Sequence, residues 1–364
     1  MSTNSIIRST DSNLPPNATY RDGLATAMRN ALADHPNTII IGQGVTDFKG
    51  IFGTMTGLHR EFPGRVIETP LSEDAVTGIC IGSALNGLYP INTHIRADFG
   101  LLAANQLINM AAKYRYMFGG HFSVPMMVRM VIGCSWGQGA QHSQSLQSLF
   151  AHIPGLLVLM PSTPDAIVRS YAHAVDHHRG PVIMFEHRLM YDLAFKASRR
   201  PPVVDPFASR VERFGRDVTI VATSIMVLEA LRAATYLAEY GVDCEVIDLH
   251  NISNPNRDLI MESLRKTGKL VVADTSWLAY GVAAEMCRIV AETDPTVLKA
   301  PVINLGMAPS PCPTAKALED IYYPDLHRTI EAVARLVRGR DDHGVPIPNH
   351  KSMTDFYKHF KGPF

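Results

Sequence analysis

The sequence lacks the features of several common protein classes. No apolar run reaches the roughly 18 residues that a membrane-spanning helix needs, and Met1–Arg21 is polar, without the apolar core of a secretion signal. We therefore expect a loose arm at the start, no membrane association and a cytoplasmic protein, with the mitochondrial matrix as the alternative. The five cysteines are odd in number and never form Cys-x-x-Cys, which indicates reduced thiols and argues against a disulfide framework.

Net charge is absent too. Basic and acidic residues balance at 34 each, so no overall field attracts nucleic acid, and we expect no nucleic-acid partner. Charged residues make up only 19% of the chain and apolar residues 46%. This composition fits a surface partly covered by another subunit, and it fits a large monomer with a large core equally well.

Several binding motifs are also missing. No Gly-Lys-Ser/Thr closes a phosphate-binding loop, and no Gly-x-Gly-x-x-Gly opens the first helix of either half. Neither His-Glu-x-x-His nor a carboxylate-rich loop is present. These absences argue against a P-loop enzyme and a dinucleotide fold, and we expect no metal site built by this chain alone.

The first half of the sequence alternates short β-branched runs with amphipathic stretches, which predicts a parallel sheet with helices on both faces. The expected helices include Asp74–Asn86 and Phe99–Tyr116. The expected strands are Thr38–Ile41, Pro90–Ile95, Pro125–Val131, Leu156–Met160 and Pro181–Phe185.

A stretch rich in proline and charge, 196–216, interrupts this pattern before the alternation starts again. The length of 364 residues suits two domains. We expect an α/β protein with two doubly wound domains in series, covering 1–197 and 217–364, joined by a linker at 198–216. The second domain is expected to contain four strands (217–222, 243–247, 270–273, 301–305) and four helices (226–240, 256–266, 281–291, 324–337), followed by a polar tail.

One short motif suggests a different enzyme class. Residues 133–137 read Gly-Cys-Ser-Trp-Gly and follow an apolar strand, as the nucleophile turn of an α/β-hydrolase does. That turn leads directly into a helix, whereas Gly137 and Gly139 stand where the helix would begin, and each glycine costs a helix about 1 kcal/mol. We therefore do not interpret Ser135 as a nucleophile.

Three other stretches form a more coherent set. They are Thr69-Pro-Leu-Ser-Glu-Asp, Arg96-Ala-Asp-Phe99 and Ala140-Gln-His-Ser-Gln144, and each lies near the end of an expected strand or the start of a helix. Parallel sheets place their sites at that edge. Ser72 and Glu73 also suit simple helix capping, Phe99 suits a core position, and a histidine in a glycine-rich loop is often merely exposed.

The motifs around these residues resemble the β subunits of thiamine-diphosphate-dependent 2-oxo acid dehydrogenases, the E1 components of pyruvate, branched-chain and acetoin complexes. The resemblance covers nearly the whole chain and is fainter after residue 275. The motifs that carry it are Thr69-Pro-Leu-Ser-Glu, Gly78-Ile-Cys-Ile-Gly-Ser-Ala-Leu-Asn-Gly, Asn105-Gln-Leu-Ile-Asn-Met-Ala-Ala-Lys, Tyr116-Met-Phe-Gly-Gly, Gln141-His-Ser-Gln, Pro154-Gly-Leu and Pro181-Val-Ile-Met-Phe-Glu.

The resemblance implies a pyrimidine-binding domain followed by a transketolase C-terminal domain, and it implies roles for four residues. Glu73 would hydrogen-bond the pyrimidine ring nitrogen and so promote loss of the cofactor's thiazolium C2 proton. Ile95 and Phe99 would contact the cofactor, with Phe99 stacked on the pyrimidine. His142 would act on the reacting carbonyl as a proton donor or as a stabiliser of the transition state.

The resemblance also implies a partner. The chain has no Gly-Asp-Gly followed by Asn-Asn, the element that holds the diphosphate through Mg²⁺ in such enzymes. An α subunit would supply it in an α2β2 heterotetramer, and a lipoyl-bearing acyltransferase would receive the acyl group of a 2-oxo acid.

Some positions depart from the family pattern. Gln43 stands where acidic residues are usual, and Gln138 replaces an apolar residue. Arg96 would be able to bind a carboxylate or phosphate of the substrate, or it would form a structural salt bridge with Asp98. The stretch 307–314 also differs, which puts docking of a lipoyl-bearing partner in question. Two alternatives remain open, namely a split transketolase-like enzyme acting on a polar or phosphorylated donor, and a noncatalytic scaffold subunit.

Overall fold

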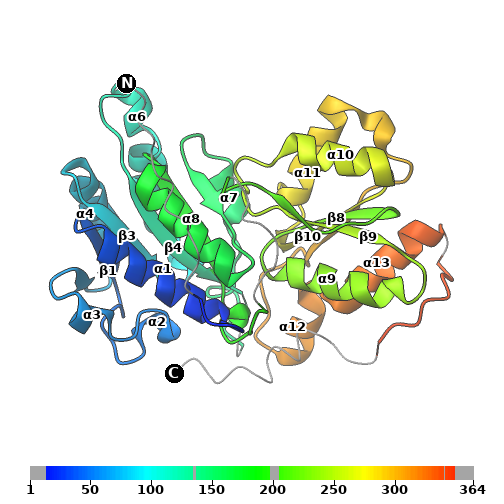
Figure 1. Ribbon diagram of the computed structural model, residues 1–364, viewed down its shortest axis with the longest axis horizontal. Helices are drawn as coiled ribbons and strands as arrows, with labels where there is room; N and C mark the ends of the chain where they lie inside the picture. The colour runs from blue at the N-terminus through cyan, green and yellow to red at the C-terminus, as the bar shows by residue number, and fades with distance from the viewer. Residues whose placement is uncertain (1–13, 134–136, 197–204, 340, 349–364) are drawn as a thin grey trace.

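The computed structural model describes residues 14–133, 137–196, 205–339 and 341–348. Within them the chain forms two α/β lobes that lie side by side, the first built mainly from the earlier half of the sequence and the second from the later half (Figure 1). The expected architecture of two α/β domains in series is confirmed.

The first lobe contains a six-stranded sheet in the order β2-β1-β3-β4-β6-β5, and every pairing is parallel. Its central strands are buried on both faces, which explains why they read as continuous apolar runs in the sequence. The strands are β1 (Thr38–Gly42), β2 (Val66–Glu68), β3 (Tyr89–His94), β4 (Met126–Ile132), β5 (Leu157–Leu159) and β6 (Pro181–His187).

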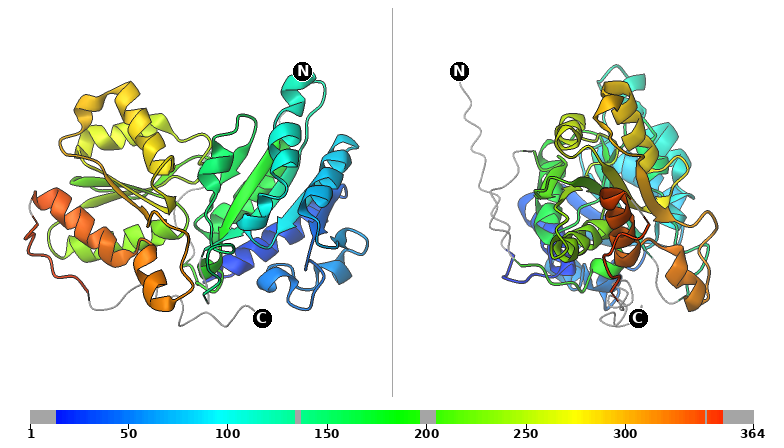
Figure 2. Two further views of the ribbon diagram at one scale, coloured as in Figure 1. Left: turned by 180° about the vertical axis from the view of Figure 1, so that it is seen from behind. Right: turned by 90° about the vertical axis from the view of Figure 1, so that its right-hand side faces the viewer.

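Helices cover both faces of this sheet. Helices α1 (Tyr20–Asp34) and α8 (Pro164–His177) pack together across one face, while α4 (Glu73–Leu85) lies on the other, which is seen from behind in Figure 2. Helix α1 begins inside the segment that we expected to be a loose arm. Thr19 caps it, because its hydroxyl accepts from the backbone N–H of Asp22 while the Asp22 carboxylate accepts from Thr19 N–H.

The stretch Phe99–Tyr116 is not the single α-helix that its apolar spacing predicts. It divides into α5 (Ala97–Gly100), the π-helix η1 (Asn105–Ala111) and α6 (Tyr114–Met117). The N–H of Ala112 donates to the carbonyl of Leu107 over 3.0 Å, a bond across five residues. Apolar periodicity over so short a segment does not separate a 3.6-residue turn from a wider one.

The second lobe contains a five-stranded sheet in the order β11-β10-β8-β9-β7. Its strands are β7 (Arg210–Arg213), β8 (Val218–Ala222), β9 (Cys244–Asp248), β10 (Leu270–Trp277) and β11 (Ile303–Met307). Strand β7 pairs antiparallel with β9 and lies in the stretch that we expected to be linker. It is a short, polar edge strand, so its sequence carries little strand signal.

Helices sandwich this sheet as well. Figure 1 shows α10 (Arg257–Thr267) and α11 (Val282–Thr293) on one side and α9 (Ile225–Ala238) and α13 (Leu326–Arg338) on the other. Part of the expected tail packs against the same lobe, where the Tyr236 hydroxyl donates to the Pro346 carbonyl over 2.8 Å.

Buried polar contacts join the two lobes. Helix α7 (Gln147–Ala151) lies at their junction, and the side-chain amide of Gln147 donates to the Asp274 carboxylate over 2.8 and 3.0 Å. Leu159 and Asn251 form an antiparallel bridge close by. Gln147 and Asp274 are both buried, so the two lobes exclude water from this part of their contact, and each of the two side chains satisfies the other there.

The remaining short helices are α2 (Gly50–Gly53), α3 (Leu58–Glu61), η2 (Arg188–Met190), η3 (Pro295–Val297) and α12 (Lys316–Tyr322). Across the described ranges, no helix is both long and apolar enough to cross a membrane. Four of the five cysteines lie in those ranges, all as free thiols; Cys134 lies outside them.

Candidate active site

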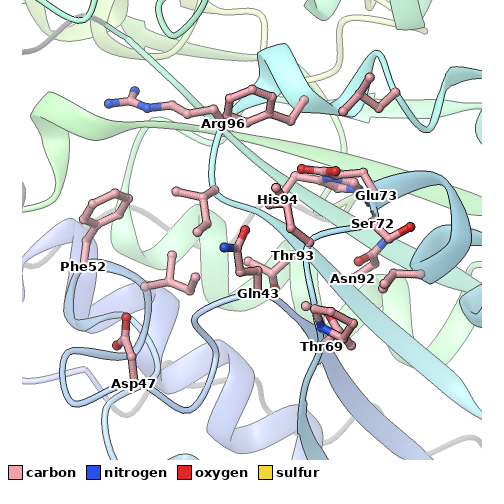
Figure 3. A pocket seen from close by; sticks show the side chains of 18 of the residues that line it. Gln43, Asp47, Phe52, Thr69, Ser72, Glu73, Asn92, Thr93, His94 and Arg96 are labelled. Carbon is pink, nitrogen blue, oxygen red and sulfur yellow. Dashed lines mark hydrogen bonds between the residues drawn. The ribbon is translucent and has the colours of Figure 1, made fainter.

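A cavity of about 490 Å³ opens at the carboxyl ends of β1 and β3, beside the start of α4 (Figure 3). Because the strands are parallel, the loops that follow them meet at this edge of the sheet. The sequence-predicted site residues all line this one cavity: Glu73, Ile95, Arg96, Phe99, Gln138 and His142. Segments as far apart as 42–52 and 138–142 contribute to it.

Glu73 is the first residue of α4 and is half-buried at the cavity. Ser72 occupies the N-cap position, but its side chain makes no capping hydrogen bond, so the sequence-based account of plain capping fails for Ser72. The carboxylate of Glu73 therefore stands beside the cavity at the end of a helix where backbone N–H groups are unpaired. A ligand with a hydrogen-bond donor fits that position.

Phe99 and His142 lie on the same wall of the cavity. Their ring centroids are 5.2 Å apart and the rings meet edge to face at 85°. Phe99 is half-buried, so it is not the fully core-facing residue of the alternative reading. His142 is half-buried as well and contacts Phe99, so it is not merely an exposed loop residue. The pair combines a flat apolar surface with a group able to transfer protons.

The loop that carries His142 is held by the second lobe. An added Cβ at Gly137 would stand 2.7 Å from the Thr314 carbonyl oxygen, and one at Gly139 would stand 2.8 Å from the Thr314 hydroxyl. Both glycines also have positive φ. The close approach that excludes a side chain at these two glycines is to Thr314. Ser135 lies outside the described residues.

Arg96 follows β3 and is only 2% exposed. Its guanidinium donates to the Gly133 carbonyl over 3.0 Å and to the side-chain oxygen of Gln138. Asp98, which we considered as a salt-bridge partner, instead accepts hydrogen bonds from the backbone and side-chain nitrogens of Gln144 over 3.2 and 2.9 Å. These two neutral acceptors are among the groups that orient Arg96.

His94 is the last residue of β3, two positions before Arg96, and it also lines the cavity. Burial lowers its pKa to about 4, so the ring is neutral near pH 7. The Asn92 side-chain nitrogen lies 2.9 Å from the Thr77 hydroxyl and 3.3 Å from His94 Nε2. Since an amide nitrogen only donates, Nε2 accepts, and Nδ1 carries the ring hydrogen.

The sequence reasoning missed the cavity-lining pair Ile51 and Phe52. Both have positive φ values, 45° and 56°, which are costly for such bulky residues. The only sequence signal was the pair of flanking glycines, Gly50 and Gly53. Strain of this kind often accompanies ligand-binding loops.

Within the described ranges, no three or more His, Cys, Asp or Glu side chains gather in a way that could hold a metal ion.

Two family models match the chain. Residues 17–192 match the transketolase pyrimidine-binding domain, and residues 208–328 match the transketolase C-terminal domain. The first match includes every residue that lines the cavity.

Among characterised proteins, the chain is similar to the pyruvate dehydrogenase E1 component subunit β-2, mitochondrial, of Oryza sativa. The two are 37% identical over 325 residues, covering 87% of this chain and 85% of that protein. It is also similar to the β subunit of acetoin:2,6-dichlorophenolindophenol oxidoreductase from Cupriavidus necator, at 33% identity over 323 residues, covering 86% and 95% of the two chains.

Among solved structures, the fold is similar to that described as a split gene transketolase, inactive β4 tetramer. The TM-score is 0.72 at 21% sequence identity, covering 88% of this chain and 98% of the other. At that identity the similarity concerns the fold.

Proposed function

The chain belongs to the family of the β subunits of 2-oxo acid dehydrogenase E1 components, and we propose that it acts as such a subunit together with an α subunit. The proposed reaction is decarboxylation of a 2-oxo acid and transfer of the acyl group to a lipoyl group, with thiamine diphosphate as cofactor. The observation that carries this proposal is the meeting of Glu73, Phe99 and His142 at one cavity.

The residues at the cavity fit this cofactor. An aminopyrimidine is a flat ring with a hydrogen-bonding edge and two apolar faces. Glu73 offers a carboxylate acceptor for the edge, and Phe99 and Ile95 offer apolar surface for a face. The volume of about 490 Å³ lies within the usual range for small-molecule sites.

We assign roles to the residues accordingly. When bound, the cofactor would supply a carbon nucleophile and would accept the electron pair that stays behind when CO2 leaves the donor. Glu73 holds a proton at the ring-nitrogen edge and so keeps that edge in one orientation. Phe99 restricts the ring from one face, and His142 is positioned beside it to donate a proton to the carbonyl oxygen of the donor.

We further propose that the α subunit holds the diphosphate and Mg²⁺ in an α2β2 heterotetramer. This is consistent with the lack of Gly-Asp-Gly and Asn-Asn in the sequence. An exposed apolar surface near the cavity suits a subunit contact: Phe48 is 83% exposed, Leu71 69% and Leu102 60%. Such surface is uncommon on a monomer.

Co-expression with the α subunit tests the proposal. The purified pair is expected to bind thiamine diphosphate with Mg²⁺ and to release CO2 from a 2-oxo acid when a lipoyl domain or an artificial electron acceptor is present. A screen of aldoses and phosphorylated ketoses runs in parallel, because a split transketolase-like enzyme would cleave those donors instead. Failure to bind the cofactor, or to use any donor, would refute an enzymatic role and favour a scaffold subunit.

A further inference from the structure

One wall of the cavity carries a buried cation. The cavity is lined by both apolar and polar side chains. Around Arg96, the apolar Ile51, Phe52 and Leu102 also contribute to the lining, and Arg96 itself adds a guanidinium. In the view of Figure 3, Arg96 and Phe52 lie on the side away from Glu73 and Ser72. The charge therefore stands apart from Glu73, which is proposed to hold the edge of the cofactor's ring.

The guanidinium is fixed in place. Gly133 and Gln138, both in the segment after β4, accept its hydrogen bonds. Arginine keeps its charge at any physiological pH. Both of these acceptors, a backbone carbonyl and an amide oxygen, are neutral, so they orient the guanidinium and do not cancel its charge. This geometry preorganises the group for an anion, because little side-chain freedom remains to be lost when a ligand binds.

One further cation lies behind this wall, and it is not His187. That residue, at the end of β6, is fully buried, and burial and the charge of Arg96 lower its pKa to about 3, so its ring is neutral near pH 7. Arg188 lies with its guanidinium carbon 4.3 Å from the centroid of the Phe52 ring. Burial lowers the pKa of Arg188 to about 10; Tyr191 and Asp192 oppose that shift, while Arg21 and Arg96 add to it.

The two guanidinium groups of Arg96 and Arg188 favour one class of substrate. An apolar acyl group against this wall would offer the buried Arg96 guanidinium neither a hydrogen-bond acceptor nor a negative charge, which is unfavourable. A carboxylate or a phosphate matches the planar fork of donors. Both anions can accept two parallel hydrogen bonds from one guanidinium.

We propose that the donor is a 2-oxo acid whose acyl chain carries a second anionic group, and that Arg96 binds this group while Gln138 positions the guanidinium. This inference rests on the proposed function and narrows it. Arg96 then determines specificity, since an uncharged donor of the same length gains nothing from it.

The test uses the complex of this chain with its α subunit and four donors. 2-Oxoglutarate carries a distal carboxylate, 3-phosphonopyruvate carries a phosphonate, and 2-oxopentanoate and pyruvate are uncharged beyond the common 2-oxo acid group. We expect kcat/KM, measured as CO2 release, to be at least about tenfold higher for one of the first two than for 2-oxopentanoate. A preference for 2-oxoglutarate would show that the second anionic group is a carboxylate, and a preference for 3-phosphonopyruvate would show that it is a phosphate-like group.

The Arg96→Met variant keeps much of the side-chain length and removes the charge. It is expected to lower kcat/KM for the preferred donor by about 100-fold, mainly through KM, and to change that for 2-oxopentanoate by less than about threefold. Arg60→Met, on the exposed surface of α3, is the matched control. Gln138→Leu, at a half-exposed position, tests the same idea if Arg96→Met does not fold.

A binding readout without turnover completes the design. Glutarate is expected to inhibit the wild-type complex more strongly than pentanoate does, and Arg96→Met is expected to abolish that difference. Equal losses for all donors would overturn the inference, because Arg96 would then bind the carboxylate that every 2-oxo acid shares. A wild-type preference for pyruvate, with intact CO2 release, would overturn it too and leave the proposed function standing. Absence of CO2 release from every donor would instead count against the proposed function.

Discussion

The hydroxyl of Tyr323, in the second lobe, donates a hydrogen bond over 3.3 Å to the backbone carbonyl of Ser143, the residue after His142. The two residues are 180 positions apart and both are buried. Together with Thr314 against Gly137 and Gly139, this contact makes the position of His142 depend on the second lobe. That lobe therefore has a role at the cavity without lining it.

Replacing this hydroxyl tests that dependence. Tyr323→Phe is expected to lower kcat about tenfold, because small displacements of a catalytic group are costly to the rate, while KM changes little. The hydroxyl also lies 3.5 Å from Cys312 Sγ, and both contacts are long, so its loss should reduce the free energy of unfolding by only about 1–2 kcal/mol. Steady-state kinetics of the reconstituted enzyme and urea unfolding measure the two effects.

Tyr322→Phe is the matched control for that variant. The Tyr322 hydroxyl donates over 2.9 Å to the Ser310 carbonyl. The variant therefore removes a hydroxyl from the adjacent residue and leaves the hydrogen bond to the His142 loop in place. Equal kcat losses in both variants would mean that Tyr323 has only a general structural role.

Glu73→Gln is expected to leave assembly and cofactor binding intact and to abolish exchange of the cofactor's C2 proton. The amide keeps the shape of the side chain but cannot hold a proton at the ring nitrogen as a carboxylate does. Proton exchange, followed by NMR in deuterated buffer, measures this directly. Asp74→Asn, at the exposed neighbouring carboxylate in the same helical turn, is the control and should exchange normally. Undiminished exchange in Glu73→Gln would refute the assigned role.

His142→Ala is expected to slow turnover by about 100-fold or more, which is typical when an acid–base group is lost, while the cofactor still binds. Cofactor affinity measured by fluorescence quenching, alongside kcat, separates the two effects. His121→Ala provides the comparison, since His121 is exposed and does not line the cavity. If His142→Ala fails to fold, His142 is a structural residue.

The fold followed closely from the sequence where the hydrophobic pattern was continuous. Strand β4, which is buried along its whole length, was expected within one residue at each end. Strand β7 was missed because an edge strand with polar side chains lacks that pattern. The π-helix η1 was missed because hydrogen-bond register inside a helical stretch is set by packing and not by spacing.

Sequence motifs predicted the residues of the candidate site, but they did not predict the residues that surround it. Glu73, Phe99 and His142 stand in stretches that the family pattern marks. The contact of Tyr323 with the His142 loop joins residues that no local signal relates. The neighbourhood of His187 and Arg96 also depends on which strands are adjacent, since β4 lies between β3 and β6. Strand order is a property of the folded sheet.

Buried histidines should make the protein labile to acid. Burial lowers the pKa of His94 to about 4 and those of His187 and His250 to about 3, from 6.5. The unfolded chain therefore binds more protons at these sites below pH 6.5. Their stabilisation is complete above pH 6.5 and is lost as the pH falls from there to the folded pKa values of about 4 and 3. Asp248 acts in the opposite direction between about pH 4 and 6, because burial raises its pKa to about 6.

The His187→Asn variant checks this argument. It should reduce the pH dependence of the free energy of unfolding between pH 4 and 6.5 by about one proton, or about 1.4 kcal/mol per pH unit. His121→Asn, at an exposed position, should leave the slope as it is. Urea unfolding at half-unit pH steps provides the slopes, and equal slopes for wild type and His187→Asn would contradict the assignment.

The largest effect on stability is expected from the buried ion pair between Arg129 and Glu186. Both side chains are fully buried, and the guanidinium binds the carboxylate over 2.6 and 2.8 Å. The hydroxyls of Tyr171 and Tyr191 also donate to this carboxylate, so four hydrogen bonds converge on Glu186. Burial itself, together with the negative charge of Glu186, raises the pKa of both tyrosines.

Glu186→Gln removes the negative charge and leaves the Arg129 charge buried without it, so it should cost about 3–5 kcal/mol of unfolding free energy. The double variant Arg129→Met/Glu186→Leu removes both charges and should recover much of the lost unfolding free energy. In a buried ion pair, the cost of removing both charges from water offsets most of their mutual attraction. Glu61→Gln, which breaks the exposed pair with Arg29, is the surface control and should change little. A double variant as unstable as Glu186→Gln would show that the hydrogen bonds of the two tyrosines, and not the unpaired charge, dominate the energetics of this network.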